Sequence, residues 1–204
     1  MIRIAKSLVT ILAVAVIAVG ATGAYFSDTE TSTGNTFTSG TLDLNVDGGN
    51  TNVVKFTAAN LRPGNQPKGS WTLANVGSVN GYLDLENIAI TDTENGCVDP
   101  ETGAGDVTCD NPGVGQGELS DVLGLMIFVD RNGDSWYSVG DSYVYNGMAN
   151  GIGASYDVNE PINAGSSTKI VAILNWWSTS SDDLAQGDSM QLDVTFELGQ
   201  TTGQ

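Results

Sequence analysis

Beyond residue 40 the chain consists of short segments with the patterns of extended structure, separated by residues that favour turns. The sequence contains 26 glycines and abundant Thr, Ser, Asn and Asp, a composition typical of strands and turns rather than helices. The run LGLMIFV at 123–129 is apolar throughout, which predicts a strand buried on both faces. Strands are expected at 41–46, 52–58, 71–75, 81–90, 123–129, 142–145, 168–176 and 189–198, and helix only at 118–123 and 181–186. Such a series of short strands predicts an all-β sandwich.

The first 24 residues have the features of an export signal. Arg3 and Lys6 give a positively charged start, an apolar core occupies 8–19, and small residues follow up to Ala24. A membrane-spanning helix needs about 20 apolar residues, so this core is short for one. We therefore expect residues 1–24 to be removed on export, so that the protein meets a membrane only during export and is secreted to the extracellular space or the cell surface.

The expected cleavage lies between Ala24 and Tyr25, and cleavage after Gly23 is the nearby alternative. A competing interpretation keeps the apolar segment, as type IV pilins do. In that case the leader would be cut at Lys6-Ser7, ahead of the apolar helix. The first residue of the purified protein separates the two interpretations.

Residues 25–38 are expected to form a polar, extended arm ahead of the first strand that can bury a face. Threonines fall on alternate positions of this stretch before Gly34-Asn35 interrupts it. An arm of this kind lacks an obvious partner in its own domain, and it can add a strand to the sheet edge of another subunit. The residues expected to act as the donor strand are Tyr25, Phe26, Thr29, Thr31 and Thr33.

Several sequence blocks carry a family resemblance. The export segment is followed by FSD at 26–28 and by NTFTSGTLDL at 35–44. Further blocks are LRPG at 61–64, NVGS at 75–78 and the segment AQGDSMQLDVTF at 185–196. Together they resemble the TasA/camelysin family, secreted proteins that build extracellular fibres and biofilm matrix.

The resemblance implies a fold, an organisation and a function. The fold would be a jelly-roll-like β-sandwich at 39–204, preceded by the arm at 25–38 and interrupted by a loop insertion at 91–121. The protein would be the structural subunit of a filament, pilus or matrix fibre, polymerising with identical subunits by donor-strand complementation through its arm. Neighbouring filaments or matrix polysaccharide would be further partners.

The charge of the chain excludes some classes of partner. The sequence has 24 acidic and 7 basic side chains and no histidine, and two of the basic residues lie in the export segment. After its removal, 5 basic residues face 24 acidic ones, a net charge of −19. Binding to nucleic acid through phosphates requires Lys and Arg, so this class of partner is excluded. A surface of this kind gathers cations instead.

Cys97 and Cys109 are the only cysteines, and both lie in the insertion. In an exported protein they are expected to form a disulfide, which for a loop of about a dozen residues adds on the order of 3 kcal/mol. Two cysteines without histidine do not make an ordinary zinc site. The acids of the insertion could add a weak cation site, although acidic loops are usually only solvated: Asp92, Glu94, Asp99, Glu101, Asp106 and Asp110.

The segment DRNGDSWYSVGD at 130–141 has the spacing of a calcium-binding loop. Asp130, Asn132, Asp134 and Asp141 place oxygen atoms at loop positions 1, 3, 5 and 12, and the Trp136 carbonyl falls at position 7. Unlike an EF-hand, the loop has glycine at position 4, Asp at position 12 and strands on both sides. We expect it to bind Ca²⁺ in preference to Mg²⁺, the alternative being an Asx-Gly turn without metal.

The remaining residues point to binding rather than to catalysis. Trp71 is expected in the core, and of Trp176 and Trp177 one should face outwards, where it could stack on a sugar or a neighbouring subunit. The absence of histidine and of an HExxH motif removes the usual general base and the Ser-His triads. We therefore expect a protein that is not an enzyme. The alternative of a different class is a calcium-dependent carbohydrate-binding module.

Overall fold

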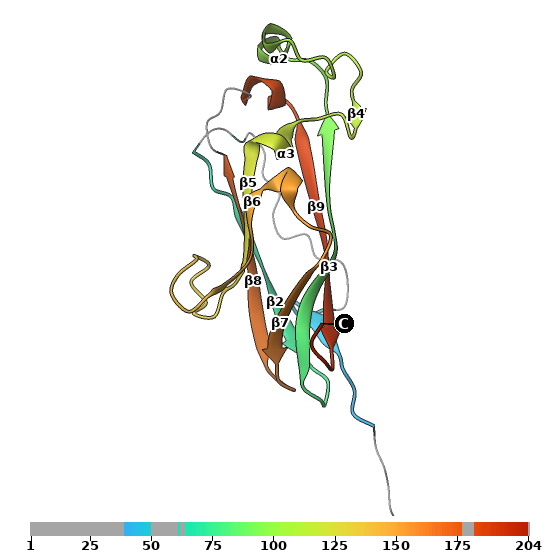
Figure 1. Ribbon diagram of the computed structural model, residues 1–204, viewed down its shortest axis with the longest axis vertical. Helices are drawn as coiled ribbons and strands as arrows, with labels where there is room; N and C mark the ends of the chain where they lie inside the picture. The colour runs from blue at the N-terminus through green and yellow to red at the C-terminus, as the bar shows by residue number, and fades with distance from the viewer. Residues whose placement is uncertain (1–38, 50–60, 62–63, 177–181, 204) are drawn as a thin grey trace, which may run out of the picture. The chain divides into compact units, whose positions relative to one another are not determined.

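The computed structural model describes residues 39–49, 61, 64–176 and 182–203 (Figure 1). The chain divides into residues 1–38 and 39–204, and the fold described below belongs to the second part. The export segment, the arm, the expected strand at 52–58 and Trp177 lie outside the described residues. No helix in the described part is long and apolar enough to cross a membrane.

The described residues form two antiparallel sheets, as the strand pattern predicted. The order of strands in the first sheet is β1 (Leu44–Val46), β2 (Lys68–Asn75), β8 (Ser167–Trp176), β5 (Leu123–Val129) and β6 (Ser142–Met148). In the second sheet β3 (Gly81–Glu94) pairs along its whole length with β9 (Ser189–Gly199), and its other edge pairs with β7 (Tyr156–Ile162) and β4 (Gly113–Val114). Most neighbours are remote in sequence, as in a jelly-roll-like sandwich.

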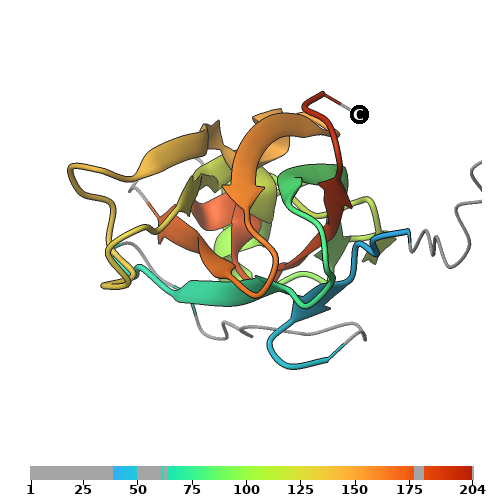
Figure 2. The same ribbon diagram turned by 90° about the horizontal axis from the view of Figure 1, so that it is seen from below.

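The core lies between the two sheets, which are seen along their strands in Figure 2. Trp71 is buried there, as expected. Strand β5 is buried on both faces except at Met126, which confirms the prediction from its apolar run. On its outer face Phe128 belongs to a small separate cluster, and the Tyr137 ring from the following loop packs edge-on against it at 5.7 Å between centroids.

The short helices lie at the ends of the strands. Two of them were expected, namely α3 (Leu119–Val122) and the 3-10 turn η2 (Asp182–Ala185). The helix α2 (Asp99–Ala104) and the 3-10 turn η1 (Ala149–Gly151) were not. Helix α2 begins with Pro100 in its first turn, and the Glu101 carboxylate accepts a hydrogen bond from the Val98 amide, so a few local contacts are enough to form it.

Several strands differ from the sequence prediction, and β7 and β3 differ most. Strand β7 was not expected because its sequence YDVNEPI is polar and contains Pro161, a residue that edge strands tolerate. Strand β3 continues to Glu94, beyond the point at 91 where the insertion was expected to begin. Pairing with β9 from Tyr82 to Thr93 explains this extension, since a long partner keeps the polar end of β3 in the sheet.

Candidate functional site

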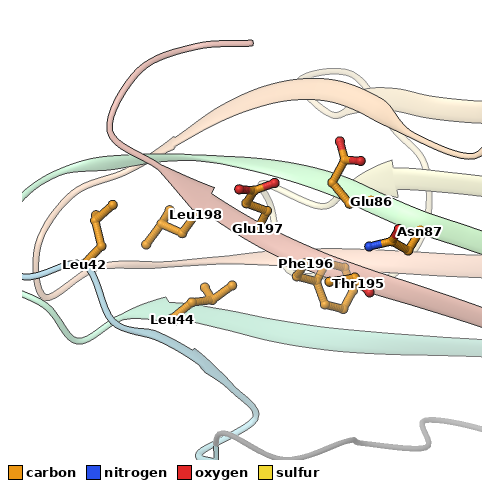
Figure 3. A pocket seen from close by; sticks show the side chains of 8 residues that line it. All are labelled: Leu42, Leu44, Glu86, Asn87, Thr195, Phe196, Glu197 and Leu198. Atoms are coloured by element: carbon orange, nitrogen blue, oxygen red, sulfur yellow. The ribbon is translucent and has the colours of Figure 1, made fainter. Parts of the chain in front are cut away.

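A groove of about 400 Å³ lies between the start of β1 and strand β9. Its apolar lining comes from Leu42, Leu44, Phe196 and Leu198. Figure 3 shows Leu42, Leu44 and Leu198 gathered in the space between the two strands, with the carboxylates of Glu86 and Glu197 pointing away from them. The groove therefore has an apolar floor and acidic residues beside it.

Strand β9 presents a row of apolar side chains that its own domain covers only in part. The inward positions alternate regularly with exposed polar ones, and all of them pack on the core while remaining half-buried: Met190, Leu192, Val194, Phe196 and Leu198. Their neighbours on β3, Leu83 and Leu85, are fully buried. Among the described residues β9 pairs only with β3, so its second edge has backbone groups available for another strand.

The segment that precedes β1 is held against the turn between β2 and β3. The Thr41 amide donates to Ser78 Oγ at 2.9 Å, and the Ser78 amide donates back to the Thr41 carbonyl at 2.8 Å. A Cβ on Gly77 would lie 2.2 Å from the Thr41 carbonyl oxygen, and one on Gly40 would lie 2.1 Å from Val79 Cγ1. These contacts require glycine at both places, and they hold residues 40 and 41 against the turn.

In the loop at 130–141 the first expected ligand, Asp130, is buried and already paired. Its side chain is 0% exposed and lies 3.0 Å from the Lys169 ammonium. The Gly133 and Ser135 amides donate to its two oxygens at 2.7 and 2.9 Å. Burial opposes the charged form, but the hydrogen bonds from Lys169, Ser135 and Gly133 outweigh it and hold the pKa of Asp130 below its ordinary value.

The other expected ligands each close a turn of the same loop. Asp134 Oδ1 accepts from the Trp136 amide at 2.7 Å, and the Asp134 amide donates to Asn132 Oδ1 at 3.0 Å. Asp141 accepts from the Arg131 amide at 2.9 Å. All five residues thus lie in one loop, but the carboxylates of Asp130, Asp134 and Asp141 do not converge within 4.8 Å of one another in the part of the chain described. Calcium binding by this loop stays a prediction.

Aromatic side chains extend from the loop onto the neighbouring strand β6. The Tyr137 and Tyr143 rings stack at 3.7 Å between centroids, and the Trp136 ring is 48% exposed with the Lys68 ammonium 3.9 Å from its centre. A partly exposed aromatic surface of this kind can bind a sugar ring or another protein.

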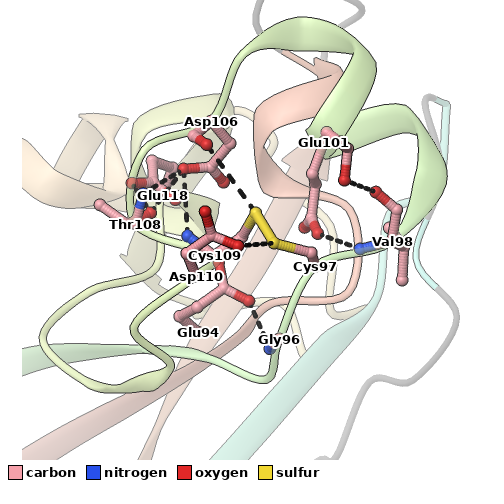
Figure 4. The surroundings of a disulfide bond; sticks show 11 residues. Glu94, Gly96, Cys97, Val98, Glu101, Asp106, Thr108, Cys109, Asp110 and Glu118 are labelled. Carbon is pink, nitrogen blue, oxygen red and sulfur yellow. Dashed lines mark hydrogen bonds between the residues drawn. A yellow bond between two sulfur atoms is a disulfide. The ribbon is translucent and has the colours of Figure 1, made fainter.

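In the insertion Cys97 and Cys109 form the expected disulfide, with their Cα atoms 4.6 Å apart (Figure 4). Five carboxylates surround it or lie next to it, from Glu94, Glu101, Asp106, Glu118 and Asp188. Burial, followed by the nearby charges of Glu94, Glu118 and Glu101, raises the pKa of Asp188 to about 7, although the Glu118 amide opposes this shift. Burial and neighbouring acids also raise the pKa of Glu101 and of Glu118.

These pKa shifts predict that in metal-free buffer the protein loses stability as the pH rises. An Asp188 side chain that ionises near pH 3.8 when unfolded but near 7 when folded releases its proton first in the unfolded state, so unfolding becomes more favourable between those pH values and changes no further above about 7. Urea unfolding from pH 4.5 to 7.5, a range chosen to span roughly that interval, should show the decline. The variant Asp188→Asn should show a flatter profile, and an unchanged slope would contradict the assignment.

The sequence comparison adds a family to this geometry. A family model described as camelysin metallo-endopeptidase matches residues 3–113, more than half of the chain. No curated protein matches the chain.

The residues present do not fit the catalytic zinc that a metallo-endopeptidase implies. Zinc enzymes of this kind bind their metal through histidine, and the sequence contains none. Both cysteines are taken up by the disulfide. The matched region contains the contacts between Gly40-Thr41 and Gly77-Ser78. On this match the chain belongs to the camelysin family.

Proposed function

We propose that this protein is a structural subunit of an extracellular filament, in which the N-terminal arm of one copy adds a strand to β9 of the next. The camelysin family includes secreted, fibre-forming matrix proteins, and the disulfide suits an oxidising environment outside the cytoplasm. The arm is the segment at 25–38, and the acceptor is the groove between β1 and β9. Backbone hydrogen bonds would supply affinity, and alternate side chains would fill the groove.

The observation that carries the proposal is the half-buried apolar row of β9. In a sandwich that is complete by itself, side chains on the inner face of a strand are buried by the opposite sheet. Here all five inward side chains of β9 remain half-buried, and two of them, Phe196 and Leu198, line an apolar groove. A donor strand along the second edge of β9 would pair the backbone of that edge and cover this row in one step.

The charges predict that assembly depends on salt. The arm contains Asp28 and Glu30 and no basic residue, and Glu86 and Glu197 stand beside the groove. Subunits with a large net negative charge repel one another at low ionic strength, and salt screens this repulsion. Filaments should therefore form more readily as the salt concentration increases.

The experiment that tests the proposal removes residues 25–38 from the mature protein. The shortened subunit keeps its groove but has lost its donor, so we expect a folded monomer that does not elongate. Added in small amounts to intact subunits, it should accept the last arm of a growing filament and shorten the filaments. Electron microscopy and sedimentation measure both effects. Filaments of normal length from the shortened subunit alone would contradict the proposal.

A matched variant separates a strand role from a loss of folding. Thr31→Pro removes one backbone donor from the arm and leaves the sandwich untouched. It should weaken polymerisation while the melting temperature of the monomer stays the same. Thr31→Val keeps the backbone donor and is the control.

The second candidate is a carbohydrate-binding module, and the exposed Trp136 ring beside stacked Tyr137 and Tyr143 is the observation that favours it. Binding of monomers to glycans that is lost in Trp136→Ala would support this function. A catalytic role is not part of the proposal, because the sequence has no histidine for the usual general base. If the protein is instead a pilin that retains its N-terminal helix, the mature chain will still contain residues 8–19.

A further inference from the structure

Five acidic side chains from separate parts of the chain lie close together at the end of the sandwich that carries the disulfide. Figure 4 shows four of them, Glu94, Glu101, Asp106 and Glu118, around the disulfide. Glu94 ends β3 and Glu101 lies in α2, while Asp106 and Glu118 flank the loop that contains Cys109. Asp188 directly precedes β9. Glu94 is 1% exposed and Glu101 is 0% exposed, so two of these carboxylates are removed from bulk water.

Each of these carboxylates uses one oxygen to bind the protein. Glu94 Oε1 accepts from the Gly96 amide at 2.5 Å, and Glu101 Oε2 accepts from the Val98 amide at 2.8 Å. Asp188 Oδ2 accepts from the Glu118 amide at 2.6 Å. Asp106 Oδ1 and Glu118 Oε1 share the hydroxyl of Thr108, at 2.7 and 2.9 Å. One oxygen of every member is therefore fixed, which orients the other.

The second oxygen of each carboxylate is buried and has no hydrogen-bond partner among the described residues. These atoms are Glu94 Oε2, Glu101 Oε1, Asp106 Oδ2, Glu118 Oε2 and Asp188 Oδ1. The carboxylates form two groups whose oxygens lie within 4.8 Å of one another, one with Asp106 and Glu118 and one with Glu101 and Asp188. Glu94 belongs to both groups, so it stands at the centre of the cluster.

No basic side chain of the described part of the chain compensates these charges. The basic residues described are Lys68, Arg131 and Lys169, and all three make their contacts at the loop 130–141 or the strands beside it. Buried carboxylates without a cation are strongly unfavourable, and they repel one another as well. Among the described residues, no basic side chain is therefore paired with these carboxylates.

We propose that this cluster, with Glu94 as the shared ligand, is a binding site for Ca²⁺. A calcium ion takes 6–8 oxygen ligands at about 2.3–2.6 Å, so oxygens on opposite sides of it lie nearly 5 Å apart, which the 4.8 Å groups accommodate. The donors are carboxylate oxygens only, since the two cysteines nearby form the disulfide and the chain has no histidine. Such a set suits a hard cation rather than zinc or copper.

The site would connect the insertion to the sandwich. Its ligands come from the end of β3, from α2, from within and after the loop closed by the disulfide, and from the residue before β9. A bound ion would therefore hold the insertion against the ends of β3 and β9. In the proposed function, β9 is also the strand that provides the acceptor edge. It is a separate site from the loop at 130–141, whose Asp130 is neutralised by Lys169.

The test measures calcium binding and thermal stability on the mature protein and on three variants, each of which removes one negative charge. Glu94→Gln changes the shared ligand, Asp99→Asn changes an exposed acid of the same insertion, and Asp134→Asn changes the loop at 130–141. Isothermal titration with CaCl₂ should give a Kd at or below the millimolar range of extracellular calcium sites. Glu94→Gln should weaken binding by roughly tenfold or more, as the loss of a charged ligand does, while Asp99→Asn should bind as the unchanged protein does.

Stability provides a second readout, which a purely structural role of Glu94 would not produce. Without calcium, Glu94→Gln removes repulsion and should melt at the same temperature as the unchanged protein or higher. With calcium, the unchanged protein and Asp99→Asn should gain melting temperature, and Glu94→Gln should not. The proposal is overturned if the unchanged protein binds no calcium up to about 10 mM, well above the usual range of such sites, or if Asp134→Asn alone abolishes binding.

Discussion

Changing Leu42 to lysine should stop filament growth while leaving the subunit folded. Leu42 is half-buried at the groove, where it faces Leu198 (Figure 3). In the free subunit a lysine there can extend its ammonium group into water. An inserted arm would enclose that charge, and removing an ammonium group from water costs several kcal/mol even where a carboxylate such as Glu197 lies nearby. Since every 1.4 kcal/mol is a factor of ten, a cost of about 3 kcal/mol raises the critical concentration for assembly roughly a hundredfold.

The matched control is Thr41→Lys, which adds the same charge at the neighbouring, exposed position. It should assemble nearly as the unchanged protein does, because its side chain does not line the groove. Sedimentation at a series of protein concentrations gives both critical concentrations, and circular dichroism confirms the fold. Equal assembly by the two variants would show that the groove between β1 and β9 is not the acceptor.

The sequence predicted the strands well because each of them is a local pattern. The apolar run at 123–129 and the alternation at 189–198 became β5 and β9 with almost unchanged bounds. The groove could not be predicted in the same way, because it depends on bringing Leu42 and Leu198 to the same place. That proximity follows from the order of strands in two sheets, and no local pattern specifies that order.

The acidic cluster could not be predicted from the sequence for the same reason, because its members come from separate parts of the chain. Glu94, Glu101 and Asp106 were recognised as acids of one insertion, which alone suggests a solvated loop. The fold adds Glu118 and Asp188, and the second of these is 94 residues from Glu94 in the numbering of the chain. The block at 185–196 carried part of the family resemblance, but its sequence gives no sign that Asp188 lies close to Glu94 at the end of β3. The fold brings these acids together and buries two of them, Glu94 and Glu101.

The loop at 130–141 illustrates the opposite case, a local motif whose surroundings were missed. Spacing alone placed oxygen atoms at the positions of a calcium loop, and in the structure Asp130 and Asp134 accept hydrogen bonds from amides of the same loop. Lys169 on β8 was not part of the motif, yet its ammonium lies 3.0 Å from Asp130 and bonds Ser135 Oγ at 2.5 Å. The pairing of β5 with β8, which places Val129 opposite Ile170, brings this lysine to the loop.

Replacing Lys169 by methionine should therefore destabilise the protein by about 3–5 kcal/mol, the usual cost of removing one partner from a buried ion pair. Asp130, whose side chain is fully buried, would keep its charge without compensation. The double variant Asp130→Asn with Lys169→Met should lose less stability than the sum of the two single changes, since the double variant leaves no unpaired charge behind. Urea unfolding gives all three free energies. A loss below about 1 kcal/mol for Lys169→Met, which is typical of exposed pairs, would contradict this account.

Lys169→Met also tests calcium binding by the loop at 130–141 more directly than the unchanged protein can. Without the ammonium group, the Asp130 carboxylate is no longer paired. The motif supplies further side-chain oxygens from Asn132, Asp134 and Asp141 in the same loop. If the loop binds Ca²⁺, millimolar calcium should stabilise Lys169→Met by more than it stabilises the unchanged protein, because binding to the folded state adds about 2.7 kcal/mol when calcium exceeds Kd a hundredfold. Adding Asp134→Ala to Lys169→Met should abolish this additional stabilisation by calcium. If calcium stabilises Lys169→Met by no more than it stabilises the unchanged protein, the loop is a turn closed by its own amides and by the lysine.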